Sequence, residues 1–244
     1  MFFKKKEEIE FPKTVEINST SYTVVVSFYK KKSSSVSFKE NTLHFRLSSY
    51  LSYNETRSHF KSLLDSISKK LSTLNISSTS FKDIIEKKMF YFAGKQFTII
   101  LHNKRITKIS DSVVYVDENL SLEIMEKKIK KLLLKHFSQN LVDYVHYINS
   151  ISYRAPITGV VVKDVSSKWG HCTHTNEILM NIKLLNAPKE VLDYVIYHEL
   201  SHVKHKNHSS AFWNEVARFC PNYKYLRSEL KKNPPSFLCL DNNY

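Results

Sequence analysis

Residues 197–208 are of types and spacing that suit metal-dependent chemistry. His198 and His202 are four residues apart, so on an α-helix they lie on one face, one turn above the other, and both imidazoles can point at one ion. Glu199 lies one residue round the helix, which places its carboxylate beside a metal's open position rather than on the metal. His-Glu-x-x-His on a helix is typical of two zinc ligands with a glutamate general base.

A third ligand is expected from the segment that follows the helix. His208 comes six residues after His202, where the helix must have ended and the chain can turn back, and Asn207 is a candidate left-handed turn residue for that reversal. Two rivals stay open. His205 lies near the helix end, and Glu215 on the next helix could be a ligand or could orient a ligand histidine.

Three nitrogen ligands with one open position suit catalytic zinc. Zinc lowers the pKa of its bound water to about 7 and polarises a scissile carbonyl, while Glu199 would accept a proton from the water and pass it to the leaving group. Other divalent ions can occupy such sites. We therefore predict an enzyme, a zinc-dependent hydrolase, with Glu199 as its base and His198, His202 and His208 as its metal ligands.

The elements around this segment can be placed from their patterns. A helix is expected from Pro188 to about Lys206, with apolar residues at helical spacing. Strands are expected over 156–165 and 177–185, joined by a turn over 166–176, and the two could form an antiparallel pair. The second strand could offer an edge to an extended peptide or lie inside the sheet, and both readings stay open. Ser209 or Ser210 can cap a further helix.

The first half of the chain is rich in strand patterns. Alternating and β-branched runs predict strands over 22–29, 35–38, 42–47, 89–101 and 110–116, and a helix is expected over 54–74. A lysine-rich amphipathic helix follows over 120–147. No internal repeat is recognisable. The expected fold is α+β: a β-rich amino-terminal region over 1–119, then a mainly helical, zincin-like core with a small antiparallel sheet over 120–244.

Several stretches together resemble the YgjP-like metallopeptidase family, which is related to the SprT-like and WSS-type zincins. The matching residues are Ser167-Lys168-Trp169-Gly170-His171-Cys172, Asn181, Ala187-Pro188, Asp193-Tyr194-Val195, His198-Glu199-Leu200-Ser201-His202, Asn207-His208-Ser209 and Phe212-Trp213. The resemblance is strong over about 150–232 and weaker over 20–150. It implies a zincin-like core with peptide or protein substrates. His171 departs from the family pattern, as do extra residues before Met89.

Composition and charge indicate which cellular compartment and which partners to expect. The 244 residues include three scattered cysteines and no Cys-x-x-Cys pair, so a disulfide framework is not expected and a reducing cytoplasm is. No apolar run is long enough to span a bilayer, and charge follows Met1-Phe2-Phe3 where a signal peptide would be apolar, so no membrane partner is expected. The net charge of +14 suits a lysine-rich solvated surface or an anionic partner such as nucleic acid.

Other chemistry stays open from the residues alone. His171, Cys172 and His174 could form a second metal site, although three residues in one short turn rarely supply tetrahedral geometry. Tyr153, Arg154 and Tyr223 could stabilise an oxyanion, and nothing in their spacing selects one. The alternative functions are hydrolysis of a nucleotide phosphoanhydride at the same metal and base, processing of DNA-linked proteins by a nucleic-acid-associated protein, and a zinc-stabilised structural domain.

Overall fold

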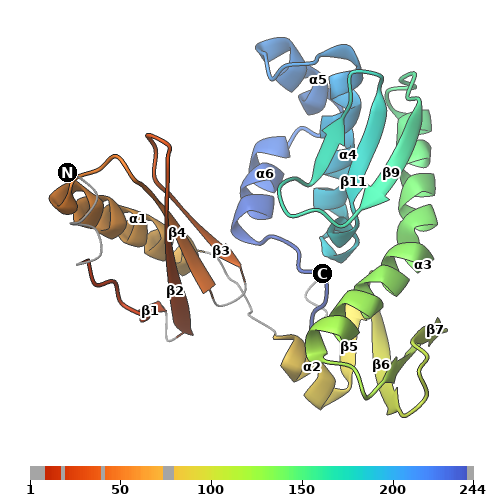
Figure 1. The fold of residues 1–244 in the computed structure, drawn as a ribbon. Helices are drawn as coiled ribbons and strands as arrows, with labels where there is room; N and C mark the ends of the chain where they lie inside the picture. The colour runs from red at the N-terminus through yellow and green to blue at the C-terminus, as the bar shows by residue number, and fades with distance from the viewer. Residues whose placement is uncertain (1–8, 18–19, 40–41, 74–79, 241–244) are drawn as a thin grey trace. The chain divides into compact units, whose positions relative to one another are not determined.

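The computed structural model describes residues 9–17, 20–39, 42–73 and 80–240, and it divides into two compact units, residues 1–78 and 79–244 (Figure 1). The fold class is α+β, as predicted: the described residues form six α-helices, one short 3-10 helix and three sheets. The predicted division at 119/120 falls inside the second unit, between a sheet and the helix that packs on it. As the boundary of a catalytic core it stays a prediction.

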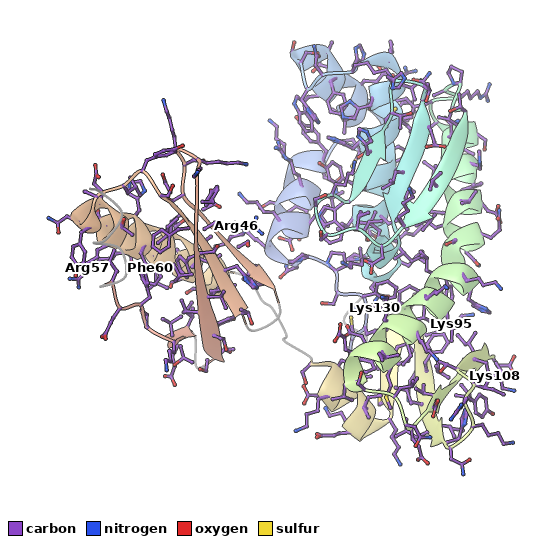
Figure 2. The ribbon with its side chains drawn as sticks, viewed as in Figure 1. Arg46, Arg57, Phe60, Lys95, Lys108 and Lys130 are labelled. Carbon is purple, nitrogen blue, oxygen red and sulfur yellow. The ribbon has the colours of Figure 1, made fainter. Side chains whose placement is uncertain are left out.

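The first unit is a four-stranded sheet with one helix. Its sheet has the order β1-β2-β4-β3, with β2 and β4 parallel and the outer pairs antiparallel. Alternate side chains of β4 are fully buried and pack with the apolar stripe of α1, which includes Phe60 (Figure 2). The elements are β1(Thr14–Ile17), β2(Thr20–Tyr29), β3(Ser35–Lys39), β4(Thr42–Ser48) and α1(Tyr53–Thr73). The predicted last residue of this helix, Leu74, lies outside the described residues.

The second unit begins with another sheet of four strands, ordered β5-β6-β8-β7. Phe90, Phe92, Phe97 and Ile99 are almost fully buried on its inner face, against one stripe of a long helix. The predicted strand over 89–101 is instead a hairpin of β5 and β6, with Gly94 at its turn in left-handed backbone. The elements are α2(Phe81–Lys87), β5(Met89–Phe92), β6(Lys95–His102), β7(Lys108–Ser110), β8(Val113–Asp117) and α3(Leu122–Ile151).

These two ββββα arrangements repeat each other. In both, the second and fourth strands are parallel, and their pairing ends at matching places: Tyr29↔Ser48 corresponds to His102↔Asp117. The third strand follows suit, since Ser35↔Arg46 corresponds to Lys108↔Tyr115, and Figure 2 marks Arg46 and Lys108. The same backbone bond closes each turn, Ser49 N–H to Tyr29 O and Glu118 N–H to His102 O. The two arrangements therefore share a topology without a recognisable repeat in the sequence.

The rest of the second unit is a three-stranded sheet packed with helices (Figure 1). Its order is β10-β11-β9, so β11 lies inside the sheet and β10 forms an edge. The elements are β9(Gly159–Lys163), β10(Gly170–Cys172), β11(Glu177–Asn181), η1(Ile182–Asn186), α4(Lys189–Lys204), α5(Ser210–Phe219) and α6(Tyr223–Lys232). Among the described residues, no helix combines the length and apolar composition that a membrane span requires.

The pairing in this sheet corrects the predicted topology. β9 and β11 are parallel rather than antiparallel, and the small sheet is mixed. The reason is that part of the predicted turn, Gly170–Cys172, is itself a strand and takes the antiparallel place beside β11. The second predicted strand also ends early, because the Asn181 side chain accepts a bond from Lys183 N–H and starts η1.

The chain's last described segment is tied to the second unit by one buried amide. Asn186, 4% exposed, accepts a bond from Ala93 N–H at 2.7 Å and donates to the carbonyls of Ser236 and Phe237 at 3.0 and 2.9 Å. A backbone bridge between Tyr91 and Cys239 adds to this. One side chain thus joins the β5–β6 turn, the segment before α4 and the carboxy-terminal segment.

Candidate metal centre

Three imidazoles meet at the end of α4. His198 and His202 project from adjacent turns of the helix, and His208 arrives from the loop beyond it; one ring nitrogen from each lies within 4.8 Å of the others. The Nε2 atoms of His198 and His208 are 3.0 Å apart. The ring centroids of His202 and His208 are 4.7 Å apart. The structure therefore brings together the three histidines that the sequence selects.

The reversal that delivers His208 differs from the predicted one. α4 ends at Lys204, and His205 follows in extended backbone with φ −122°. Asn207 is not among the described residues with positive φ, so the expected left-handed turn there is wrong. Ser209 then caps α5 by accepting a bond from Phe212 N–H at 3.4 Å. The turn is set by the two helix ends rather than by one left-handed residue.

The two rival ligands lie outside the group. His205 contributes its carbonyl, which lies 2.9 Å from His202 Nδ1. Glu215 pairs with Lys204 at 3.5 Å and Arg218 at 3.9 Å, so it orients no ligand histidine. The bond between His202 Nδ1–H and the His205 carbonyl leaves Nε2 of His202 with a free lone pair, as ligand histidines in proteins commonly show.

The electrostatics of the group suit a cation. Burial, together with neighbouring His202 and His208, lowers the pKa of His198 to about 3, and burial also lowers the pKa of His202. Both rings are therefore neutral near pH 7, which is the form that binds metals. His198 Nδ1 is buried and has no hydrogen-bond partner among the described residues. Converging neutral imidazoles fit a divalent ion such as zinc.

Glu199 lies in a niche beside this group. Its side chain is 5% exposed, and burial raises its pKa to about 8, opposed by a bond from the backbone N–H of Cys172 and by the charge of Lys168. It touches strand β10 at Gly170. A buried carboxyl with a pKa near neutrality can take up and release a proton at ordinary pH.

Aromatic rings enclose the imidazoles. Phe212 is fully buried, with its ring 4.9 Å from that of His198 and 4.4 Å from that of His202. Trp213 stacks on His208 at 5.5 Å and on Tyr223 at 5.1 Å. Phe212 belongs to the core of the second unit, while half-buried Trp213 packs against that core and forms one wall of the site.

The other sequence candidates are placed elsewhere. The Tyr153 hydroxyl bonds Ser201 Oγ at 2.7 Å and donates to the Glu215 carbonyl at 3.2 Å, so it is already committed away from the histidines. His171, Cys172 and His174 form no ligand group: Cys172 is buried, and His171 and His174 are exposed. Sequence reasoning missed Gly170 as a contact of Glu199, and only its place in the family pattern could have drawn attention to it.

Comparisons with known proteins match a part of the chain that includes these site residues. A family model described as "YgjP-like, metallopeptidase domain" matches residues 32–233. Among solved structures, the metallopeptidase zymogen abylysin of Pyrococcus abyssi matches with 25% identity and TM-score 0.31, over 39% of this chain and 96% of its own. The zymogen jannalysin of Methanocaldococcus jannaschii matches with 24% identity and TM-score 0.34, over 37% and 92%. No curated protein matches the chain.

Proposed function

Because the chain belongs to the YgjP-like metallopeptidase family, we propose that it is a zinc-dependent peptidase in which Glu199 is the general base. One observation carries the proposal: three imidazole nitrogens converge within 4.8 Å, next to a buried carboxyl that is not one of the converging groups. Three ligands and a separate base match the division of labour in catalytic zinc sites.

His198, His202 and His208 would hold the ion, and the His205 carbonyl would keep the His202 ring in its ligand tautomer. A bound zinc ion would supply Lewis-acid activation of the attacking water and of the scissile carbonyl. Glu199 would accept the proton of that water on a carboxylate oxygen and deliver it to the leaving amine.

The walls of the site would support this proton transfer. Phe212 and Trp213 surround the imidazoles with apolar surface, which fixes the rings and limits water around them. Burial keeps the pKa of Glu199 near 8 in the metal-free protein. A carboxyl with this pKa can gain and lose a proton at ordinary pH.

The test is metal analysis combined with hydrolysis of fluorescein-labelled casein. We expect about one zinc per chain. Glu199→Gln should keep the metal and lose about 100- to 10,000-fold in turnover, the range for general acid–base catalysis. Glu190→Gln, on the exposed first turn of the same helix, is the matched control and should cleave as wild type does. Full turnover by Glu199→Gln, or hydrolysis of ATP without cleavage of casein, would refute the proposal.

A further inference from the structure

Strand β10 turns one edge toward the helix that carries Glu199. The N–H of Asn181 donates to the Trp169 carbonyl at 2.8 Å, and the N–H of Thr173 donates to the Glu177 carbonyl at 2.9 Å. Hydrogen-bonded and non-bonded residues alternate along an antiparallel pair. The backbone N–H and C=O groups of residues 169, 171 and 173 therefore face β11, while the N–H groups of Gly170 and Cys172 point away from it. That outward edge meets α4, and Glu199 is the α4 residue whose side chain lies against Gly170 there.

Gly170 leaves no room for a side chain on this edge. A Cβ atom built on it would lie 2.5 Å from both Cγ and Oε1 of Glu199 and 2.7 Å from Cδ, closer than Cβ atoms come to other atoms in proteins. The φ angle of Gly170 is outside the left-handed region. Alanine would therefore suit the backbone, and the nearest obstacle to its methyl group is the carboxyl side chain in front of it.

The strand is held in register on its other side. The buried Asn181 side chain donates to the carbonyls of Val165 and Lys168 at 2.8 and 2.9 Å, which secures the loop that leads into β10. Lys206 donates to the Thr173 carbonyl at 3.2 Å and to Asn176 Oδ1 at 2.6 Å, which secures the turn that follows. With both ends of the strand secured, Glu199 is the movable partner.

We propose that β10 aims the general base, and that Gly170 is a positioning residue that sets where the Glu199 carboxyl rests. The absent Cβ opens the space that Cγ and Oε1 of Glu199 occupy. This inference rests on the proposed function of Glu199. It adds that the strand before the metal helix determines the direction in which the proton acceptor points.

The first variant is Gly170→Ala. All three atoms nearest the new methyl group belong to the flexible Glu199 side chain, so we expect that side chain to move and the backbone to stay. The protein should keep one zinc and lose about 100-fold in kcat on labelled casein, the effect of a misplacement of about 1 Å. KM should change by less than about twofold. Gly159→Ala is the matched control, because a Cβ there meets nothing within 4 Å.

The second measurement is a pair of double-mutant cycles. Glu199→Asp shortens the side chain by one methylene and vacates the contact, so adding Gly170→Ala to it should lower kcat by less than about threefold more. In metal-free protein, Gly170→Ala should lower the thermal midpoint by about 2–4 °C in the wild-type background. In the Glu199→Ala background it should not lower the midpoint, because the opposing atoms are gone.

The outcomes separate the two proposals. Wild-type turnover by Gly170→Ala, or additive effects in both cycles, would overturn the positioning role while leaving the peptidase proposal intact. If wild-type protein binds zinc but cleaves no casein, the proposed function fails. The thermal cycle, which needs neither metal nor turnover, then still decides whether Gly170 and Glu199 are coupled.

Discussion

The two ββββα arrangements share strand order and register, yet only one of them supports the candidate metal centre. In the first unit, the buried apolar residues of α1 (Phe60, Ile67 and Leu71) all join one core with their own sheet. In the second, α3 serves two cores. Its first half, from Met125 to Phe137, packs on the β5–β8 sheet. Its second half packs with α4, through Leu141, Val145 and Ile148. The shared topology is a scaffold, and the site depends on what the helix reaches beyond it.

Of the substitutions that test this comparison, one at a metal ligand should have the largest effect. His208→Ala should remove the third imidazole and weaken zinc binding by more than about 100-fold, since even loss of a ligand's hydrogen-bond partner costs 10- to 100-fold. The first unit has histidines too, and His59→Ala on α1 is the control. Competition with a zinc chelator measures both. Equal zinc affinity in wild type and His208→Ala would mean that the ion is held elsewhere.

The next test replaces one buried leucine in each of the two helices and asks which of the two replacements weakens zinc binding. Leu141→Ala should lower the free energy of unfolding of the second unit by about 2–5 kcal/mol and weaken zinc binding, because it opens a cavity under α4. Leu71→Ala should destabilise the first unit by a comparable amount and leave zinc binding unchanged.

Tryptophan fluorescence can separate these two transitions in urea. Both tryptophans, Trp169 and Trp213, belong to the second unit. Leu141→Ala should therefore shift the fluorescence transition, and Leu71→Ala should be visible only by circular dichroism. A loss of casein cleavage in Leu71→Ala would show that the first unit contributes to the site.

The metal-free second unit should also respond to pH. The folded pKa of His198 is about 3, below its ordinary 6.5, so the free energy of unfolding rises with pH from 3 to 6.5 on its account. The folded pKa of Glu199 is about 8, above its ordinary 4.5, so its contribution falls from pH 4.5 to 8. The sum rises to about pH 4.5, levels, and falls above about pH 6.5.

The slope of that fall should be at most about 1.4 kcal/mol per pH unit for one proton. Urea unfolding in the presence of a chelator, followed by tryptophan fluorescence, measures it. Glu199→Gln should abolish the fall above pH 6.5 and keep the rise below pH 4.5. The same fall in Glu199→Gln would assign it to another group.

The smallest expected effect is at the start of the two helices. Ser52 and Ser121 stand at matching places before α1 and α3. The Ser52 hydroxyl accepts a bond from Glu55 N–H at 3.4 Å, and Glu55 bonds back to Ser52 N–H at 2.7 Å. Ser121 makes no side-chain cap bond. Ser52→Ala should destabilise the first unit by about 1 kcal/mol, and Ser121→Ala by much less. Equal losses by circular dichroism would contradict this.

Much of the local structure could be predicted from the sequence. The helical spacing of Leu192, Val195, Ile196 and Leu200 predicted α4 to within two residues of its ends, and all four are buried in the second unit's core. The i, i+4 spacing then placed His198 and His202 on one face. These are properties of the helix period, which the chain carries in every window of a few turns.

Pairing between distant segments was decided only in the tertiary structure. Gly170–Cys172 looked like part of a turn, and it became a strand because β11 offered it a partner. β9 is parallel to β11, and residues 14–73 and 89–151 share one topology without sharing a sequence pattern. The contact between Glu199 and Gly170 was likewise decided only in the tertiary structure. Spacing along the chain determined which residues could act together; the packing of remote strands determined where the carboxyl lies, because strand pairing depends on contacts that no local window contains.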